Sequence, residues 1–297
     1  MTEPHKTEAQ GYSERGDEYF HNGDYDRAVA SYSVALNIDP NLISALLSRG
    51  YVFRKKGDYD KAIVDYNSVL KINPIHAEAL CWRSDAHRGK GAFDKAIADV
   101  NMALEIDPNN SNAFCNRAKA YCEKGDYKRA IEDCNTALAI DPSNPRPLKY
   151  RAKAFLGKND FNVALADIDM ALKMNPKESE LLCDRAWVCV NKGEYEKGIE
   201  DCNAALKIDP NSAAAFKYRA MMYQGKGDID KAVEDYSISL KINPGDIDIL
   251  KYRGSIFMSR HKYDQAIADF NAALQIDPND AKLLQERRKA ASEKRFG

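Results

Sequence analysis

Two short apolar stripes alternate along the chain, and the pair of stripes recurs every 34 residues. In the interval 111–144, the first stripe is Phe114, Ala118 and Tyr121, whose spacings of i, i+4 and i+7 place them on one face of a helix. The second stripe, spread over 127–138, has the same helical spacing. The pattern therefore predicts two amphipathic helices in each interval.

Residues that end helices separate the stripes. Gly125-Asp126 lies between the two stripes of this interval, and glycine accepts the left-handed conformation in which many helices end. Asn159, the next best residue for that conformation, takes the place of glycine one interval later. An Asp-Pro or Asn-Pro pair closes each second stripe, because the residue before proline disfavours the α-helical region. Each interval thus reads as a helical hairpin.

The period is strict along most of the sequence. Eight of the eleven prolines are spaced 34 residues apart, without insertion or deletion. With this proline at position 32, the repeats begin at residues 9, 43, 77, 111, 145, 179, 213 and 247. Length alone would suggest about two globular domains, but the period favours one continuous array over 9–280. A polar N-terminal leader over 1–8 and a C-terminal capping helix over 281–297 complete the expected organisation.

This spacing resembles that of the tetratricopeptide repeat (TPR) family. The shared pattern is a large apolar residue at position 4, a small one at 8, an aromatic at 11, Gly at 15, Ala at 20 and 27, and Pro at 32. His87 and Cys189 depart from it at position 11, without breaking the register. The resemblance covers roughly nine-tenths of the chain. It implies an all-α, right-handed superhelical α-solenoid of helix-turn-helix units, whose first helices line a concave groove.

A column of arginines and a column of aspartates run through the repeats. Position 7 is Arg in all eight repeats and in the capping helix, and position 23 is Asp in seven repeats. Arginine presents a planar fork that matches a carboxylate, so we interpret the two columns as structural pairs rather than as ligand sites. The cap has Arg287 but no second helix, and Asp269 of the preceding repeat is available to it. We therefore expect each Asp to pair with the Arg of the next repeat and to be shared with the Arg of its own repeat.

The groove face should consist of positions 2, 5, 6, 9, 12 and 13, which carry little packing within a repeat. Both tryptophans, Trp82 and Trp187, fall on this face, as do basic and tyrosine side chains. The peptide-binding candidates are Asn116, Lys119, Arg146, Lys149, Tyr150, Lys153, Trp187, Lys217, Tyr218, Lys251 and Tyr252. Tyr, Trp and Arg often contribute most to interface energy, and lysine beside aromatics suits a partner segment with carboxylates and apolar anchors. The alternative is that the aromatic rings pack between neighbouring helices and the lysines form a solvated edge.

Composition narrows the possible partners. The formal net charge of −1 lacks the basic excess of a nucleic-acid-binding protein. No apolar stretch is long enough to span a membrane, and the N-terminus has no signal-like apolar segment. Seven cysteines without scaffold spacing suit a reducing compartment, so a cytoplasmic location is expected.

Sites for catalysis or cofactors are not expected. None of the five histidines pairs with Cys or a carboxylate at a zinc-binding spacing, so neither a metal site nor a cofactor is predicted. Cys81, Cys115 and Cys183 share position 5, where they are either reactive thiols or apolar lining. The repeats leave no room for a catalytic domain, and the chain is not expected to be an enzyme.

The sequence therefore predicts a non-catalytic interaction scaffold or adaptor that binds a partner peptide, acidic with apolar anchors, in the concave groove. A standard chaperone-tail clamp is disfavoured, because Cys81 and Asp85 stand where that clamp requires Lys and Asn. The alternative function is a self-assembling structural scaffold, a homo-oligomer in which the N-terminal end of one protomer docks on a neighbour.

Overall fold

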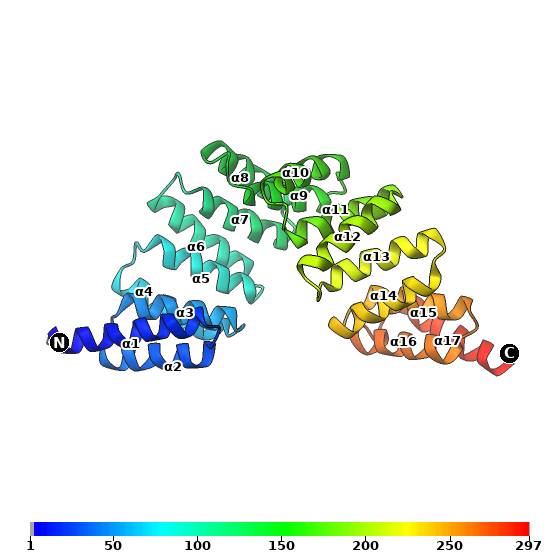
Figure 1. Cartoon of the computed structure of the whole chain (residues 1–297), viewed down its shortest axis with the longest axis horizontal. Coiled ribbons are helices and arrows are strands. Elements are labelled where there is room, and N and C mark those ends of the chain that lie inside the picture. Colours follow the sequence, from blue (N-terminus) through cyan, green and yellow to red (C-terminus); the bar gives the residue numbers. More distant parts are fainter. Residues whose placement is uncertain (1–2, 297) are drawn as a thin grey trace. The chain divides into compact units, whose positions relative to one another are not determined.

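The structure, a computed structural model, describes residues 3–296, and these form helices without a strand (Figure 1). The first helices of the eight hairpins are α1 (Glu3–His21), α3 (Ile43–Lys55), α5 (Ala77–Gly89), α7 (Ser111–Lys124), α9 (Arg146–Gly157), α11 (Ser179–Lys192), α13 (Ala213–Lys226) and α15 (Ile247–Ser259). The second helices are α2 (Tyr25–Ile38), α4 (Tyr59–Ile72), α6 (Phe93–Ile106), α8 (Tyr127–Ile140), α10 (Phe161–Met174), α12 (Tyr195–Ile208), α14 (Ile229–Ile242) and α16 (Tyr263–Ile276), and α17 (Ala281–Phe296) follows them. The predicted all-α solenoid of helical hairpins is confirmed.

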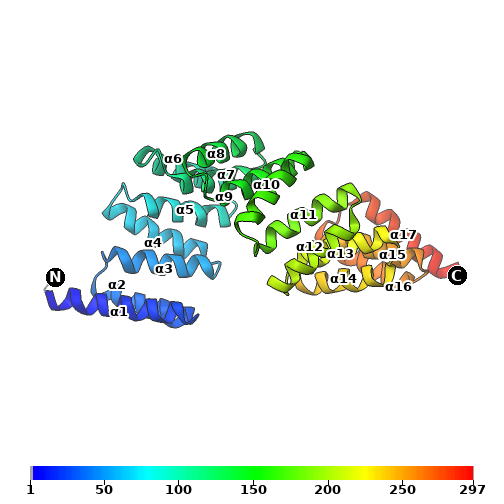
Figure 2. The same ribbon diagram turned by 45° about the horizontal axis from the view of Figure 1, so that its top comes forward.

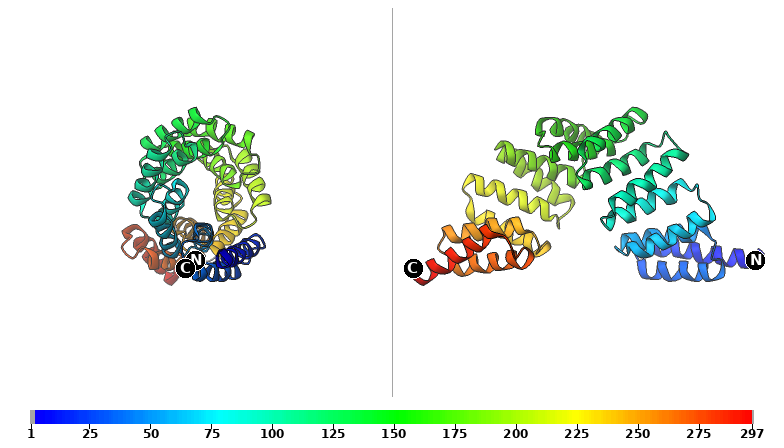
Figure 3. Two further views of the ribbon diagram at one scale, coloured as in Figure 1. Left: turned by 90° about the vertical axis from the view of Figure 1, so that its left-hand side faces the viewer. Right: turned by 180° about the vertical axis from the view of Figure 1, so that it is seen from behind.

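The hairpins belong to two compact units, Met1–Ala164 and Leu165–Gly297, whose boundary falls within α10. In the first unit, each helix from α1 to α9 packs against the next, and the first helices α1, α3, α5, α7 and α9 also contact one another in that order (Figure 2). In the second unit, α11 to α17 stack in chain order, seen from yellow-green to red in Figure 3. Within each unit, the first helices thus form one face.

The predicted helix breaks lie where the sequence places them. Gly125 has a φ of 85° at the end of α7, and Asn159 and His261 adopt the same left-handed conformation, with φ of 61° and 57°. Asp141, which precedes Pro142, is extended with a φ of −135° and ends α8. Local chain chemistry therefore explains both connections of the hairpin.

In several hairpins, the side chains that meet in the core at positions 8 and 24 are complementary in size. Gly50 at position 8 faces the ring of Tyr66 at position 24, where a methyl group on the glycine would lie 2.7 Å from a ring carbon. In the fourth repeat, the same two positions hold Ala118 and Cys134, both fully buried. Gly16 with Tyr32 and Gly254 with Phe270 repeat the first combination, in keeping with close packing, whereas the seventh repeat accommodates Ala220 beside the fully buried Tyr236.

The arginine column pairs with the aspartate of its own repeat, not the next one. Arg117 donates from Nε and Nη2 to the two carboxylate oxygens of Asp133, at 2.8 Å and 2.7 Å. The same two-bond fork joins Arg49 to Asp65, Arg83 to Asp99, Arg185 to Asp201, Arg219 to Asp235 and Arg253 to Asp269. Positions 7 and 23 are equidistant from the turn at position 15, so antiparallel packing of the hairpin brings them to the same height. The interpretation of the two columns as structural Arg–Asp pairs is confirmed, but the prediction that each Asp also pairs with the Arg of the next repeat was wrong.

Neighbouring repeats are instead joined by position 25. Arg117 donates its third group, Nη1, to the side-chain oxygen of Asn101 in the preceding repeat, at 2.6 Å. Position 25 supplies the same acceptor to the next arginine along the array, as Ser33, Asn67, Asn135, Asp169, Asn203 and Ser237. In the final helix, Arg287 bonds Asn271, at 2.6 Å, rather than Asp269. This polar column was visible in the sequence, because positions 25 and 7 of the next repeat are equidistant from the inter-repeat turn.

The two ends of the stack differ in how they pack. At the N-terminus, α1 begins at Glu3, so the described part of the expected leader continues the first helix. At the C-terminus, α17 packs on the last repeat through Leu283 and Ala290, which are buried at positions 3 and 10. Those two positions are the ones through which a first helix contacts the repeat before it.

Candidate functional site

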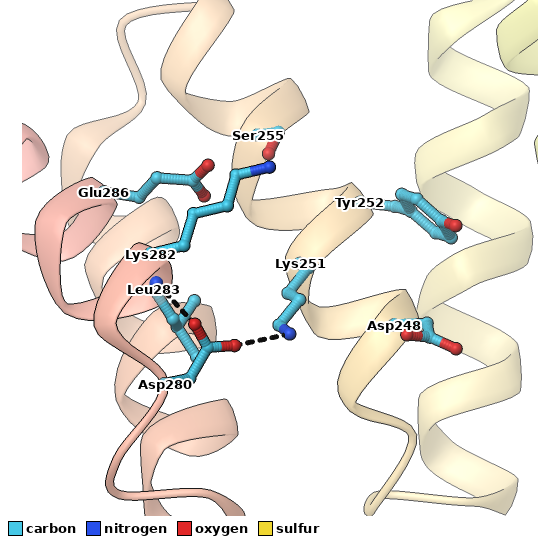
Figure 4. A pocket seen from close by; sticks show the side chains of 8 residues that line it. All are labelled: Asp248, Lys251, Tyr252, Ser255, Asp280, Lys282, Leu283 and Glu286. Atoms are coloured by element: carbon cyan, nitrogen blue, oxygen red, sulfur yellow. Dashed lines mark hydrogen bonds and ion pairs between the residues drawn. The ribbon is translucent and has the colours of Figure 1, made fainter.

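Cavities lie along the predicted groove face of the first helices. One of about 230 Å³, between α15 and α17, is lined by Lys251, Tyr252, Ser255 and their neighbours at positions 2, 5, 6 and 9 (Figure 4). An open cavity between α11 and α13 is lined by Cys183 and Tyr218 at the same kinds of position. The face predicted from the repeat pattern is therefore hollowed, and each candidate residue is described below within its own unit.

In the first unit, the candidates meet in a basic patch on α7 and α9, which we define as Asn112, Asn116, Lys119, Arg146 and Tyr150. Arg146 opens α9, and its Nη1 and Nη2 donate to the side-chain oxygens of Asn112 and Asn116, both at 2.9 Å. Prolines on either side of Arg146 restrict the backbone there and fix where its side chain leaves the helix. Both acceptors are neutral amides, so the positive charge of the guanidinium is held in place without being neutralised.

Lys119 is the second cation of the basic patch. Its Nζ lies over the Tyr150 ring, 5.9 Å from the ring centre, while the tyrosine itself is buried. Burial lowers the pKa of the Lys119 ammonium and the positive charge of Arg88 lowers it further, while the nearby carboxylates of Asp85 and Glu123 partly oppose this shift. In the part of the chain that the structure describes, neither Lys119 nor Arg146 forms an ion pair with a carboxylate. The patch therefore combines two cations that an incoming carboxylate would stabilise.

The remaining basic candidates of the first unit flank this patch. Lys149 and Lys153 are partly buried on α9, and each takes part in interactions of its own. The charge of Lys153 acts on Lys119, but the bonds that orient Arg146 come from the two asparagines.

In the second unit, Trp187 and Tyr218 pack against each other. Their ring centres are 5.5 Å apart, with 33° between the ring planes. Burial raises the pKa of Tyr218 to about 12. The two rings thus join α11 to α13, as the packing alternative expects, while Trp187 stays partly exposed on the groove face.

Lys217 and Lys251 form ion pairs within the second unit. Lys217 contacts Asp246, at 3.0 Å, and Lys251 contacts Asp280, at 2.6 Å (Figure 4). Each aspartate also caps the following helix, by accepting the backbone N–H groups of Ile249 and Leu283. Each lysine is therefore paired with the N-terminal cap of the following helix, α15 or α17. This pairing partly neutralises the charge that a ligand would meet.

Sequence reasoning missed this pairing, although a signal for it exists. Position 34 is acidic in each repeat that has Lys at position 5, with Glu178, Asp246 and Asp280 following Lys149, Lys217 and Lys251. Repeats with Cys or Leu at position 5 have no acidic residue at position 34. Tyr252 remains the most exposed aromatic candidate, at 38%, and it stacks on Tyr236 with 6.1 Å between ring centres.

The cysteines at position 5 serve as apolar lining. Cys115 and Cys183 are buried, and burial raises the pKa of Cys81, Cys115 and Cys183 to about 11 in each case. Within residues 3–296, no cluster of three or more His, Cys, Asp and Glu side chains could hold a metal ion. None of the helices described is long and apolar enough to cross a bilayer.

Thiol chemistry provides a direct check of this assignment. With a pKa near 11, only about one thiol in a thousand is ionised at pH 8, so the folded protein should react very slowly with a colorimetric disulfide reagent. In guanidinium chloride, all seven cysteines should react within minutes. Rapid reaction of the partly exposed Cys81 in the folded protein would contradict the lining role.

Comparisons with known proteins support the repeat architecture. A crystal structure of the APC/C hetero-tetramer Cut9-Hcn1 aligns with 93% of this chain at a TM-score of 0.76 and 16% identity, and the chain spans 54% of that protein's length. A thermophilic TPR protein from Thermus thermophilus aligns with 61% of this chain and 99% of its own, at a TM-score of 0.53 and 22% identity. A TPR protein from Parabacteroides merdae covers 95% of this chain and 98% of its own, at a TM-score of 0.50 and 18% identity. At these identities, the likeness concerns the fold.

No curated protein sequence matches the chain. Models of the tetratricopeptide repeat match residues 111–144, 247–280, 47–111 and 151–213, and a further TPR model matches 16–57. These matches cover most of the array, and they agree with the hairpins and with the turns between them. The chain therefore belongs to the tetratricopeptide repeat family, whose members provide scaffolds for protein–protein interaction.

Proposed function

We propose that this protein is a non-catalytic scaffold that holds an extended segment of a partner protein on the groove face, with an acidic side chain of the segment on the basic patch. The observation that carries the proposal is the state of Arg146, which is oriented by two neutral amides and lacks a carboxylate among the described residues. Lys119, at the same patch, has its pKa lowered by burial. A carboxylate of the segment would gain a charge-assisted hydrogen bond at either cation.

Reversing the two charges should abolish partner capture. The variant Lys119→Glu/Arg146→Glu should bind the partner at least about tenfold more weakly, because two charge-assisted contacts become repulsions. The measurement is affinity purification from the native host, with quantitative mass spectrometry against the wild-type chain. Partners retained equally by both chains would contradict the proposed site.

A matched control separates the patch from net charge. Lys95→Glu/Lys128→Glu makes the same change in charge at exposed positions on the second helices α6 and α8. This variant should recover partners as the wild type does, and the helical circular dichroism of all three chains should agree.

The self-assembling alternative finds less support at the N-terminal end. Positions 3 and 10 of the first repeat are Gly11 and Glu18, and both are exposed. The capping helix and the later repeats bury apolar residues there, such as Leu283 and Ala290. A polar end does not match the apolar contacts through which repeats stack. Light scattering should therefore give a monomer mass at all concentrations, and a mass that rises with concentration would favour self-assembly.

A further inference from the structure

Three aromatic side chains of the first unit lie in a row, apart from the basic patch. The ring centres of Phe20 and Tyr51 are 5.5 Å apart, and those of Tyr51 and Trp82 are 5.7 Å apart. The three come from consecutive first helices, α1, α3 and α5, and each is partly exposed. We call these residues the aromatic row, which crosses the groove face diagonally because its members occupy positions 12, 9 and 6.

Hydrogen bonding beneath the aromatic row is incomplete. Tyr66 is fully buried with its ring 6.0 Å from Trp82, and its hydroxyl lies beside the Arg54 guanidinium without a hydrogen bond of ordinary geometry to any described residue. At the same position of other repeats, the Tyr32 hydroxyl donates to Asp17 at 2.6 Å and that of Tyr236 donates to Gln224 at 2.9 Å. A buried hydroxyl without a partner is costly. Its place beneath Trp82 therefore marks a spot at which the described residues leave a polar contact unmade.

Arg54 adds a second incomplete group at the same place. Its guanidinium lies over the Tyr51 ring, 4.8 Å from the ring centre, and its Nη1 is 3.8 Å from the Asp85 carboxylate, while its buried Nε has no hydrogen-bond partner among the described residues. The partly exposed rings and the Arg54 cation together suit an aromatic side chain that also carries a hydrogen-bonding atom, such as tyrosine.

Charges along the first unit orient a segment that lies across it. Between the aromatic row and the basic patch, Arg88 pairs with Asp85 and with Glu123 at 2.8 Å, so these charges compensate one another. Beyond the row, α1 presents Glu14 and Glu18, both exposed, which repel carboxylates. A segment with an acidic end is thus directed away from α1 and toward α9.

We infer that the aromatic row is the anchor site for an aromatic residue of the same partner segment whose carboxylates occupy the basic patch; the inference rests on the proposed function. The row reaches α3 and α5, which lie two to three first helices from α9. At about 10 Å per helix and about 3.3 Å per extended residue, the span corresponds to about 6–9 residues. The partner motif is therefore an aromatic residue separated by that spacing from one or two Asp or Glu residues.

A phage-displayed library of random 16-residue peptides tests the inference on the full chain. Wild-type selection should enrich peptides with an aromatic residue about 6–9 residues from a carboxylate. The best such peptide should bind the Tyr51→Ala variant about tenfold more weakly, and replacing its aromatic residue with alanine should cost a similar factor. Making both changes together should cost little more than one alone, because the two residues contact each other.

The outcomes separate the inference from the proposed function. Suppose that the enriched acidic peptides bind Tyr51→Ala as tightly as the wild type but do not bind Lys119→Glu/Arg146→Glu. This result would overturn the inference and leave the proposed function standing. Peptides insensitive to the charge reversal would overturn both. The variant Arg54→Gln, which keeps much of the side-chain length, provides a second test in case Tyr51→Ala misfolds. It should also bind the peptide with the about 6–9-residue spacing more weakly. Unchanged binding of that peptide to both variants would contradict the aromatic row as an anchor site.

Discussion

Asp133→Ala is expected to lower the free energy of unfolding by about 3–5 kcal/mol, because it leaves a partly buried guanidinium without its carboxylate. Asp133 is 6% exposed and accepts two hydrogen bonds from Arg117, which raise the pKa of the arginine. Asn101 alone would remain as a partner on the preceding repeat. Urea unfolding followed by circular dichroism at 222 nm would measure the loss.

A double variant distinguishes pairing from simple packing. Arg117→Leu/Asp133→Ala removes both charges, and the apolar leucine takes over part of the space, so this chain should recover most of the lost stability. Hydrogen exchange should show the opening of Asp133→Ala concentrated in α7 and α8, because stability in repeat arrays depends on each unit and its neighbours. If the double variant is as unstable as the single one, the fork does not act as a pair.

Gly254→Ala is expected to destabilise the protein in one background and to stabilise it in another. A methyl group on Gly254 would lie 2.5 Å from a ring carbon of Phe270, which is fully buried. Overpacking of this kind costs about 1–3 kcal/mol, although alanine is favoured over glycine within a helix by about 1 kcal/mol. In the wild-type background, the clash should exceed the helix preference.

The contrasting background is Phe270→Cys, which copies the Ala118–Cys134 combination of the fourth repeat. There the clash is absent, so Gly254→Ala should raise the free energy of unfolding by up to about 1 kcal/mol. Chemical denaturation of the four chains gives both differences. The same sign in both backgrounds would show that the Phe270 ring is not what requires glycine at position 254.

The sequence predicted which residues lie on the groove face, but it did not predict which of their charges are neutralised within the protein. Arg146 and Lys119 were identified as groove cations, and the structure brings both to one patch with Asn112, which the sequence reasoning had not named. Lys217 and Lys251 looked equivalent to them, yet each is paired with an aspartate 29 residues later. The distinction depends on whether position 34 of the same repeat, which caps the following helix, is acidic and faces position 5.

Two of the structural errors share a physical origin. The partner of Arg117 was assigned to the wrong repeat, and Asn101 was overlooked, because apolar periodicity says which face of a helix is buried but not how two helices align in height. Alignment in height is set by the turns, and residues equidistant from a turn meet across the hairpin. Both contacts of Arg117 join residues 16 apart in the sequence.

The sequence by itself determined the repeat length, the two helices of each hairpin, their ends and the family, because each of these depends on local backbone preferences and on one repeated apolar pattern. Only the tertiary structure decided which aspartate meets which arginine, which lysines are neutralised, and that Phe20, Tyr51 and Trp82 meet in a row. Those contacts join residues about 16 to 31 positions apart in the chain. Their geometry follows from the stacking of whole hairpins, which no single stretch of the chain encodes.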